Sequence, residues 1–143
     1  IAYANKSGYK PTFFGCDGMD GILTTEGFDT SLAEGLLLMT PFNPDAPESK
    51  DFVAKYQAMM DGVVPNQFAA DGYDVIYSIY NACLATGVDG ATAPEDACAK
   101  LVEYFATYEF TGLTGSGMTW DATGMISKVP AAVKIENGKY VDM

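Results

Sequence analysis

The most informative stretch of the chain is Thr12-Phe13-Phe14-Gly15-Cys16-Asp17-Gly18-Met19-Asp20-Gly21, in which a short apolar run leads into a loop rich in glycine and aspartate. The run 12–15 is typical of a buried strand, and residues 36–39 form a second apolar run without polar alternation. Strands of this kind are usually covered on both faces, as in a parallel sheet. Open α/β sheets bind ligands at the ends of such strands, so the loop 16–21 is the first candidate for a binding site.

Three helices are expected in the middle of the chain. Asp45 and Glu48 resemble a capping box before apolar residues at helical spacing, and Gly62 ends this first helix. A second helix is expected over 66–86, and a third opens at Thr92 with another capping box. The residues expected to be buried on these two helices are Phe68, Ala69, Tyr73, Ile76, Tyr77, Tyr80 and Leu84 on the second, and Ala97, Cys98, Leu101, Val102 and Phe105 on the third. We therefore expect the helices to pack on a large apolar surface.

The two ends of the chain add a short helix and a hairpin. Residues 1–7 are expected to form helical turns that end at Gly8. Near the C-terminus, the alternation of apolar and polar residues over 131–136 and the pair Asn137-Gly138 predict a β-hairpin. Parallel-sheet strands, a block of three helices and a C-terminal β-hairpin place the chain in the α/β class.

The composition excludes several kinds of chemistry. The 143 residues include 8 Lys, no Arg, 19 Asp and Glu together, and no His, which gives a formal net charge of −11. Without His, the chain has no Ser-His-Asp or Cys-His pair and no two-His metal site. Without Arg it has no guanidinium clamp for phosphate, and its negative charge disfavours nucleic acid and anionic membrane surfaces. We therefore expect a protein that is not an enzyme and that holds no metal or cofactor.

The residues alone leave two interpretations of the loop 16–21 open. Its glycines let the backbone approach a small molecule, and its carboxylates would attract an ammonium group, because a desolvated carboxylate needs a cation. Alternatively, the loop is an ordinary solvated turn, since Asp-Gly is a common turn dipeptide. A catalytic carboxylate pair of Asp17 and Asp20 is disfavoured, as is a calcium loop, which would need ligands at alternate positions. The loop 112–117 lacks the third glycine of a dinucleotide-binding loop.

Three cysteines, Cys16, Cys83 and Cys98, form no CxxC pair. Cys16 is interpreted as a small packed thiol. Cys83 and Cys98 lie on the apolar sides of neighbouring expected helices, and whether they form a disulfide stays open. The chain opens at Ile1 without an initiator methionine or an apolar leader, so a signal peptide is expected to have been removed or to lie outside the sequence.

Seven blocks of sequence, in a fixed order, together resemble one protein family. The blocks are Gly8-Tyr9-Lys10-Pro11-Thr12-Phe13-Phe14-Gly15-Cys16-Asp17-Gly18, Ala33-Glu34-Gly35-Leu36, Thr40-Pro41-Phe42, Phe52-Val53-Ala54-Lys55-Tyr56, Pro65-Asn66-Gln67-Phe68-Ala69-Ala70-Asp71-Gly72-Tyr73-Asp74, Phe110-Thr111-Gly112-Leu113-Thr114-Gly115 and Val133-Lys134-Ile135-Glu136-Asn137-Gly138-Lys139-Tyr140-Val141. They resemble the C-terminal part of an extracytoplasmic solute-binding protein of the branched-chain amino acid ABC transporter type, which has the periplasmic-binding-protein-like I fold. The resemblance extends over nearly the whole chain.

The resemblance implies a set of ligand-binding residues. In this family, an acid after the Phe-Gly strand pairs with the α-ammonium group of the ligand, and Asp17 stands at that position. Gly18 and Met19 would line the same wall of the site, and Phe68, at the start of the long helix, would place an aromatic ring in the cleft. The implied function is capture of an amino acid, branched-chain or otherwise neutral, and its delivery to an ABC permease in the membrane. The alternative is a ligand-sensing ectodomain of the same fold that signals rather than transports.

The resemblance also implies how the chain is divided. Residues 1–41 and 127–143 would belong to one lobe of a two-lobed protein, and 42–126 would form the helical part of the other lobe. The N-terminal half of such a protein would be missing, so the chain is expected to bind that half or to associate with itself through uncovered apolar surface. The implied location is extracytoplasmic, either in the periplasm or as a lipoprotein anchored on the outer face of the cell membrane.

Overall fold

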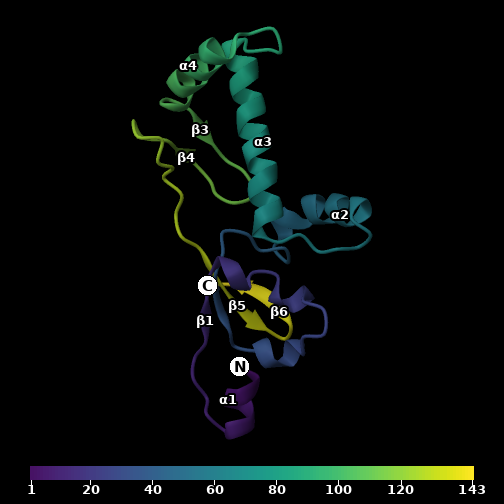
Figure 1. Cartoon of the computed structure of the whole chain (residues 1–143). Coiled ribbons are helices and arrows are strands. Elements are labelled where there is room, and N and C mark those ends of the chain that lie inside the picture. The colour runs from purple at the N-terminus through teal and green to yellow at the C-terminus, as the bar shows by residue number, and fades with distance from the viewer. The chain divides into compact units, whose positions relative to one another are not determined.

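The computed structural model describes all residues 1–143 (Figure 1). These residues form two compact units. Unit 1 comprises Ile1–Ala70 and Pro130–Met143, and unit 2 comprises Asp71–Val129. The lobes expected from the sequence, with boundaries near 41 and 127, concern a longer protein and stay a prediction. The units have a different first boundary because the segment after residue 41 packs within unit 1, where Phe42 is buried.

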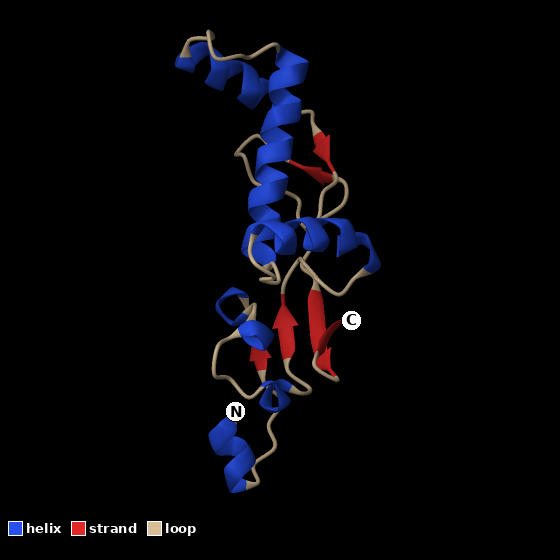
Figure 2. Cartoon of the chain, turned by 90° about the vertical axis from the view of Figure 1, so that its right-hand side faces the viewer, coloured by secondary structure: helices blue, strands red, loops and turns tan.

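Unit 1 is built on a four-stranded mixed sheet, whose strands Figure 2 shows in red. In spatial order the strands are β1 (Phe14–Gly15), β2 (Leu37–Met39), β5 (Ala132–Glu136) and β6 (Lys139–Asp142). Strands β1 and β2 are parallel, whereas the β2–β5 and β5–β6 pairs are antiparallel. The predicted parallel strands and C-terminal hairpin are both confirmed. The hairpin turns through Asn137 and Gly138, whose φ angles of 54° and 71° are those that a type I′ turn requires.

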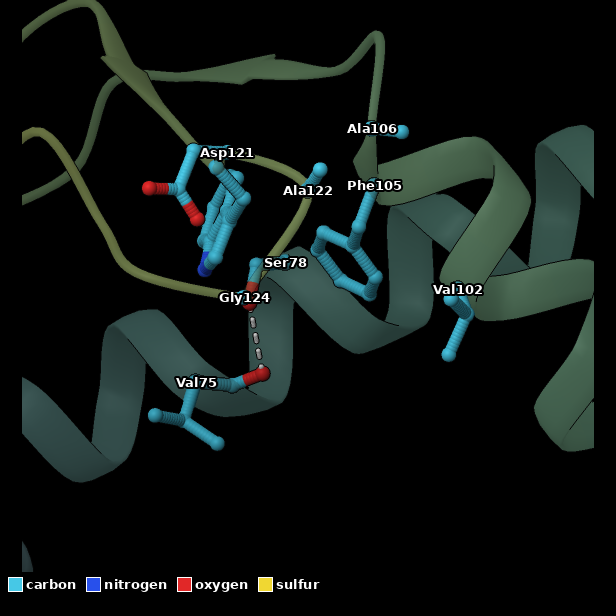
Figure 3. Close-up of a pocket in the computed structure, with 9 residues that line it drawn as sticks. Val75, Ser78, Val102, Phe105, Ala106, Asp121, Ala122 and Gly124 are labelled. Atoms are coloured by element: carbon cyan, nitrogen blue, oxygen red, sulfur yellow. Dashed lines mark hydrogen bonds between the residues drawn. The ribbon is translucent and has the colours of Figure 1, made fainter.

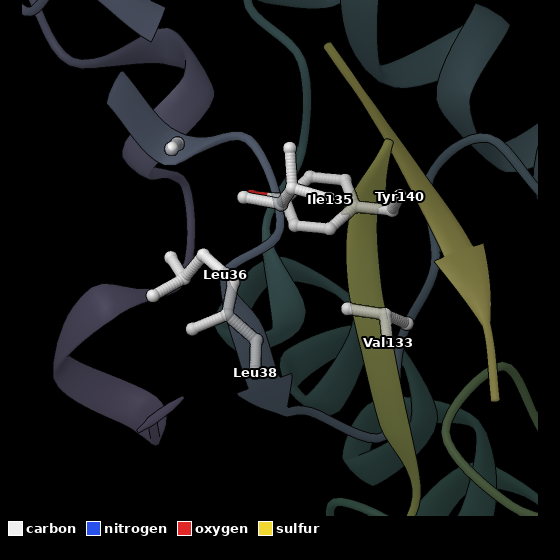
Figure 4. Close-up of a cluster of buried hydrophobic side chains, with 6 residues drawn as sticks. Leu36, Leu38, Val133, Ile135 and Tyr140 are labelled. Atoms are coloured by element: carbon white, nitrogen blue, oxygen red, sulfur yellow. The ribbon is translucent and has the colours of Figure 1, made fainter. Parts of the chain in front are cut away.

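The core of unit 1 lies on one face of this sheet. Its buried side chains are Ala33, Leu36, Leu38, Val133, Ile135 and Tyr140, five of which are labelled in Figure 4. Partly buried side chains from the segment after β1 pack against this cluster, among them Met19, Ile22 and Leu23. The loop that carries the candidate site therefore rests directly on the core.

Two helices of unit 1 lie outside the sheet. Helix α1 (Ala2–Ser7) ends at Gly8, which has a φ of 74°, as the sequence predicts. Helix α2 (Lys50–Met59) follows a 3-10 turn at Pro47–Ser49. The predicted capping box at Asp45 is wrong, because the Asp45 carboxylate instead accepts a hydrogen bond from the Tyr140 amide at 3.1 Å.

Unit 2 consists of most of helix α3 (Gln67–Thr86), helix α4 (Pro94–Phe105) and a hairpin of β3 (Glu109–Phe110) and β4 (Met118–Thr119). The predicted capping box at Thr92 is also wrong. Ala93 is the N-cap of α4, and the Thr92 hydroxyl donates to the Asp89 carboxylate in the preceding turn. A short polar side chain before a helix can bond its own turn instead of the helix.

The burial of α3 is the reverse of what its apolar pattern predicts. Its buried residues are small or polar: Gln67, Ala70, Asp74, Ser78 and Ala82. Of the residues expected to be buried, only Ala69 is partly so; Phe68, Tyr73, Ile76, Tyr77, Tyr80 and Leu84 are all exposed, with Ile76 at 66%. On α4, Cys98 and Val102 are likewise exposed, whereas Ala97, Leu101 and Phe105 are partly buried. The prediction of a buried apolar face is therefore wrong for this chain, because no other part of it covers the large side chains of α3.

No helix has both the length and the apolar character that crossing a membrane requires.

Candidate functional site

The predicted site residues lie where β1 ends. Gly15 is the last residue of β1, and a 3-10 turn, Asp17–Met19, follows after Cys16. Asp17 is exposed, and its carboxylate makes no hydrogen bond or ion pair within the chain. Gly18 is exposed as well, whereas Met19 is partly buried against the core of unit 1. The turn thus directs a carboxylate toward solvent and a thioether toward the sheet.

Gly15 allows this turn to fold back. A Cβ atom at Gly15 would lie 2.5 Å from the Met19 sulfur and 2.9 Å from Leu38 Cδ2. Both distances are shorter than an ordinary contact, so a larger residue at position 15 would force the Met19 and Leu38 side chains to shift. At Gly18, by contrast, a Cβ atom would meet nothing within 4 Å.

Asp20 joins this loop to the start of helix α3. Its Oδ1 accepts a hydrogen bond from the Gly21 amide at 2.9 Å, and its Oδ2 accepts one from the Gln67 amide at 2.6 Å. Gln67 is the first residue of α3, so Asp20 satisfies an amide that the helix itself leaves unpaired. The sequence did not predict this contact, because the two residues are 47 positions apart. With both oxygens bonded to amides, Asp20 is poorly suited to the catalytic carboxylate pair that the sequence analysis already disfavours.

Phe68 follows Gln67 directly in the first turn of α3. It is 54% exposed, and the Asn66 carboxamide accepts a hydrogen bond from the next amide, Ala69, at 3.3 Å. Asp17, Gly18, Met19 and Phe68 all belong to unit 1, in two segments that Asp20 links. Asp17 and Phe68 therefore expose a carboxylate and an aromatic ring to solvent on these two segments.

Tyr140 of β6 lies under the same loop. Its side chain is buried, and its hydroxyl makes no hydrogen bond. Burial raises the pKa of Tyr140 to about 12, with a smaller contribution from the Asp20 and Asp45 carboxylates, while the backbone amides of Gly21 and Leu23 oppose the rise. Nothing in the sequence pattern singles out Tyr140 beyond its place in a strand.

Unit 2 contains an apolar cavity of about 390 Å³ (Figure 3). It is lined by Val75, Ser78, Val102, Phe105, Ala106, Trp120, Asp121, Ala122 and Gly124. The Ser78 hydroxyl donates to the Val75 carbonyl at 3.0 Å, as the dashed line in Figure 3 marks. Hydrogen bonds from Thr123 and Met125 hold the pKa of the Asp121 carboxyl below its usual value. The Ser78 hydroxyl and one Asp121 carboxylate oxygen are therefore already hydrogen-bonded, and none of the predicted site residues lines the cavity.

The glycine-rich loop 112–117 has a structural partner in unit 2. The carboxylate of Asp74, which is only 5% exposed, accepts hydrogen bonds from the Leu113 amide at 2.9 Å and from the Thr114 amide and hydroxyl at 2.8 Å. A Cβ atom at Gly112 would overlap the same carboxylate. The loop is therefore a latch on α3, which agrees with its exclusion as a dinucleotide site.

All three cysteines are free thiols. Cys83 is partly buried on α3 and Cys98 is exposed on α4, so the disulfide that the sequence left open does not form in this structure. Cys16 is exposed, and its interpretation as a packed thiol is wrong, because the core beside it is filled by Met19 instead.

The chain is similar in fold to solved solute-binding proteins of ABC transporters. A branched chain amino acid ABC transporter periplasmic ligand-binding protein from Burkholderia xenovorans is 20% identical, with a TM-score of 0.78 over 100% of this chain and 39% of its own. The substrate-binding protein LivJ from Streptococcus pneumoniae, in complex with isoleucine, is 23% identical, with a TM-score of 0.73 over 96% of this chain and 38% of its own. A solute-binding protein from Rhodopseudomonas palustris, in complex with 3,4-dihydroxybenzoic acid, is 20% identical, with a TM-score of 0.74 over 99% of this chain and 38% of its own.

No protein-family model and no curated protein matches the sequence. The chain spans 38–39% of the length of these three solved proteins. The fold expected from the sequence is confirmed: over nearly its whole length the chain has the periplasmic-binding-protein-like I fold, as part of the fold of branched-chain amino acid ABC transporter solute-binding proteins.

Proposed function

We propose that the chain is part of the solute-binding component of an ABC importer, which captures a small molecule outside the cytoplasm and delivers it to a membrane permease. The observation that carries this proposal is the match of 96–100% of the chain to solute-binding proteins from three organisms. The lack of His and Arg supports a binding role over an enzymatic one, because it removes the usual catalytic acids, bases and phosphate clamps.

The ligand that we propose is an α-amino acid with a neutral, preferably branched, side chain. Asp17 supports this choice, because its carboxylate stands at a strand end without a partner in the chain. A carboxylate in a closed ligand site is costly unless a cation meets it, and the α-ammonium group supplies that cation. A benzoate has no ammonium group, so Asp17 disfavours an aromatic acid such as the ligand of the Rhodopseudomonas palustris protein.

The remaining site residues would contact the rest of the ligand. Gly18 leaves open space beside Asp17, and Met19 offers a polarisable thioether at the base of the turn. Phe68 has an exposed ring that could bury an aliphatic side chain against its face or edge. We propose that these three residues form one wall of the site.

A second part of the proposal concerns the rest of the protein. Beyond Phe68, the large apolar side chains of α3, among them Ile76, Tyr80 and Leu84, are exposed in this chain, although an uncharged apolar area of this kind is rarely left uncovered in a soluble protein. The solved proteins of this fold are more than twice as long as the chain, so they contain enough additional residues to cover a helix. We propose that the remainder of the complete protein packs on this face.

The test uses the complete protein that contains this chain, purified without refolding. Native mass spectrometry should detect a retained ligand with the mass of a neutral amino acid. Calorimetry after removal of that ligand should then show binding of L-leucine, L-isoleucine or L-valine and none of benzoate or 3,4-dihydroxybenzoate. Binding of the benzoates alone would contradict the proposed ligand but leave the transport role. Absence of any small-molecule binding would contradict both.

A further inference from the structure

We propose that Asp20 is a positioning residue for the ligand site. Its carboxylate ties the turn that carries Asp17 to the start of α3, which carries Phe68, so that these two segments keep a fixed arrangement around the ligand. This inference rests on the function proposed above. It concerns a residue that would not touch the ligand itself, since both of its carboxylate oxygens already accept hydrogen bonds from backbone amides.

The two hydrogen bonds of Asp20 run in different directions. One oxygen closes the loop locally on the Gly21 amide, and the other reaches Gln67 across the fold at 2.6 Å. A charged acceptor makes such a bond shorter and stronger than a neutral one, and the N-terminus of a helix favours a negative charge. Gln67 is only 2% exposed, so water competes little for this contact.

The Asp20–Gln67 hydrogen bond joins two segments that each carry a proposed ligand-binding residue. Asp20 stands three residues after Asp17, and Gln67 immediately precedes Phe68. Without the contact, the turn and the helix start would each keep only their own local hydrogen bonds. With it, a displacement of the turn also displaces the helix start, so the backbones that carry Asp17 and Phe68 move together.

Packing on both sides of Asp20 limits its movement. Even a Cβ atom added to Gly21 would lie 3.8 Å from the Asn66 Cβ, so the loop and the residue before α3 are neighbours without crowding. Gly21 also accepts hydrogen bonds from the Thr24 amide and hydroxyl, both at 2.9 Å, which closes the next turn. The side chain of Tyr140 is buried beneath this segment, and its strand is held by the Asp45 carboxylate.

The first test measures affinity in the complete protein for the amino acid found by native mass spectrometry. Asp20→Ala should weaken binding roughly tenfold, a capping-size effect, and Asp20→Asn, which can still accept one amide hydrogen bond, should weaken it less. A double-mutant cycle with Asp17→Asn then separates positioning from a general loss of stability. If Asp20 acts by placing Asp17, its substitution should cost much less affinity once Asp17 is already Asn. Fully additive losses would overturn the inference.

Asp29→Ala provides the matched control for Asp20→Ala, because it removes a capping carboxylate in the same way. Asp29 also caps a short turn of unit 1, where its carboxylate accepts hydrogen bonds from the Ser31 amide at 3.1 Å and the Ser31 hydroxyl at 2.7 Å. It has no contact with α3, so its substitution should leave the affinity unchanged. An equal loss of affinity in both variants would mean that any weakened cap has this effect, and the proposed role of Asp20 would be wrong.

The second test does not depend on a ligand. Hydrogen exchange of the complete protein should become faster in Asp20→Ala for amides of both the turn at 17–24 and the helix start at 67–70, and should not change there in Asp29→Ala. Unchanged exchange in both segments would overturn the inference even if the protein binds amino acids. Faster exchange in both segments, in a protein that binds no amino acid, would support the contact and refute the proposed function.

Discussion

Asp17 is the residue on which the proposed ligand depends. In the complete protein, Asp17→Asn would leave a buried ammonium group without its counter-charge while keeping the size of the side chain. We expect the affinity for the amino acid to fall by two to three decades, or roughly 3 to 5 kcal/mol, with little change in thermal stability. Isothermal titration calorimetry of the wild type and the variant measures this. Unchanged affinity would exclude Asp17 from the site.

Tyr140 gives a prediction that is independent of any ligand. Because its buried hydroxyl makes no hydrogen bond of good geometry and only lies near the Gly21 and Leu23 amides, Tyr140→Phe removes a polar group that is poorly satisfied in the folded state. We expect the free energy of unfolding at neutral pH to stay the same or to rise by about 1 kcal/mol. Chemical denaturation followed by circular dichroism tests this, and a loss of 2 kcal/mol or more would show that the hydroxyl has a partner after all.

The same tyrosine should make the protein sensitive to alkali. Its pKa is raised from 10.0 to about 12 in the folded state, so between these values the unfolded chain releases a proton that the folded chain keeps. Stability is therefore fully present below pH 10 and falls as the pH rises toward 12, by at most about 1.4 kcal/mol for each pH unit. Tyr140→Phe should lose less stability over this range than the wild type. Parallel curves for the two proteins would contradict the raised pKa.

At the level of residues, the sequence predicted those backbone conformations that depend only on residues adjacent in the chain. Gly8 and the pair Asn137-Gly138 adopt the positive φ angles expected of them, because a helix end and a two-residue hairpin need only local geometry. The roles of Asp20 and Asp74 could not be predicted, because their backbone partners are 47 and about 40 positions away. Distant pairings of this kind leave no periodic signal in a sequence.

Among the elements, the contact between α3 and the loop 112–117 can be tested by comparing alanine substitutions at two glycines. Gly112→Ala would force a Cβ atom into the Asp74 carboxylate, which is buried and bonded to Leu113 and Thr114. We expect a loss of about 2 kcal/mol or more in the free energy of unfolding of the complete protein. Gly72→Ala is the control, since it lies in α3 with nothing within 4 Å of the added Cβ atom and should stabilise by about 0.5 to 1 kcal/mol. Equal effects from the two substitutions would contradict the latch.

The capping boxes show where prediction of elements fails. Both helices form, but neither Asp45 nor Thr92 caps them, because each side chain has a better partner elsewhere in its unit. A capping motif specifies only residue types at a spacing of three, and these polar residues also form turns and tertiary contacts. The helices themselves were predictable, since their periodicity extends over many residues.

At the scale of the whole molecule, the apolar face of α3 should behave differently in this chain and in the longer protein to which we propose that it belongs. The sequence correctly marked the large side chains of α3 as suited to burial, but burial needs a covering layer that these 143 residues do not supply. Periodicity reports the face that a helix prefers to bury, and only the complete fold decides whether that face is covered. One substitution on this face should therefore have two different effects.

Ile76→Lys should produce these two effects. Ile76 is 66% exposed on the uncovered face, so the 143-residue chain alone should self-associate through this face, and the lysine should weaken that association. In the complete protein, where we propose that the face is covered, the same lysine would be buried without a partner and should cost about 3 kcal/mol or more of stability. Met59→Lys, at an apolar and 81% exposed position in unit 1, should neither weaken self-association nor destabilise the complete protein.

Sedimentation velocity of the chain and thermal unfolding of the complete protein measure the two effects. A monodisperse chain at high concentration, or a complete protein that tolerates Ile76→Lys, would mean that the face is an ordinary solvated surface.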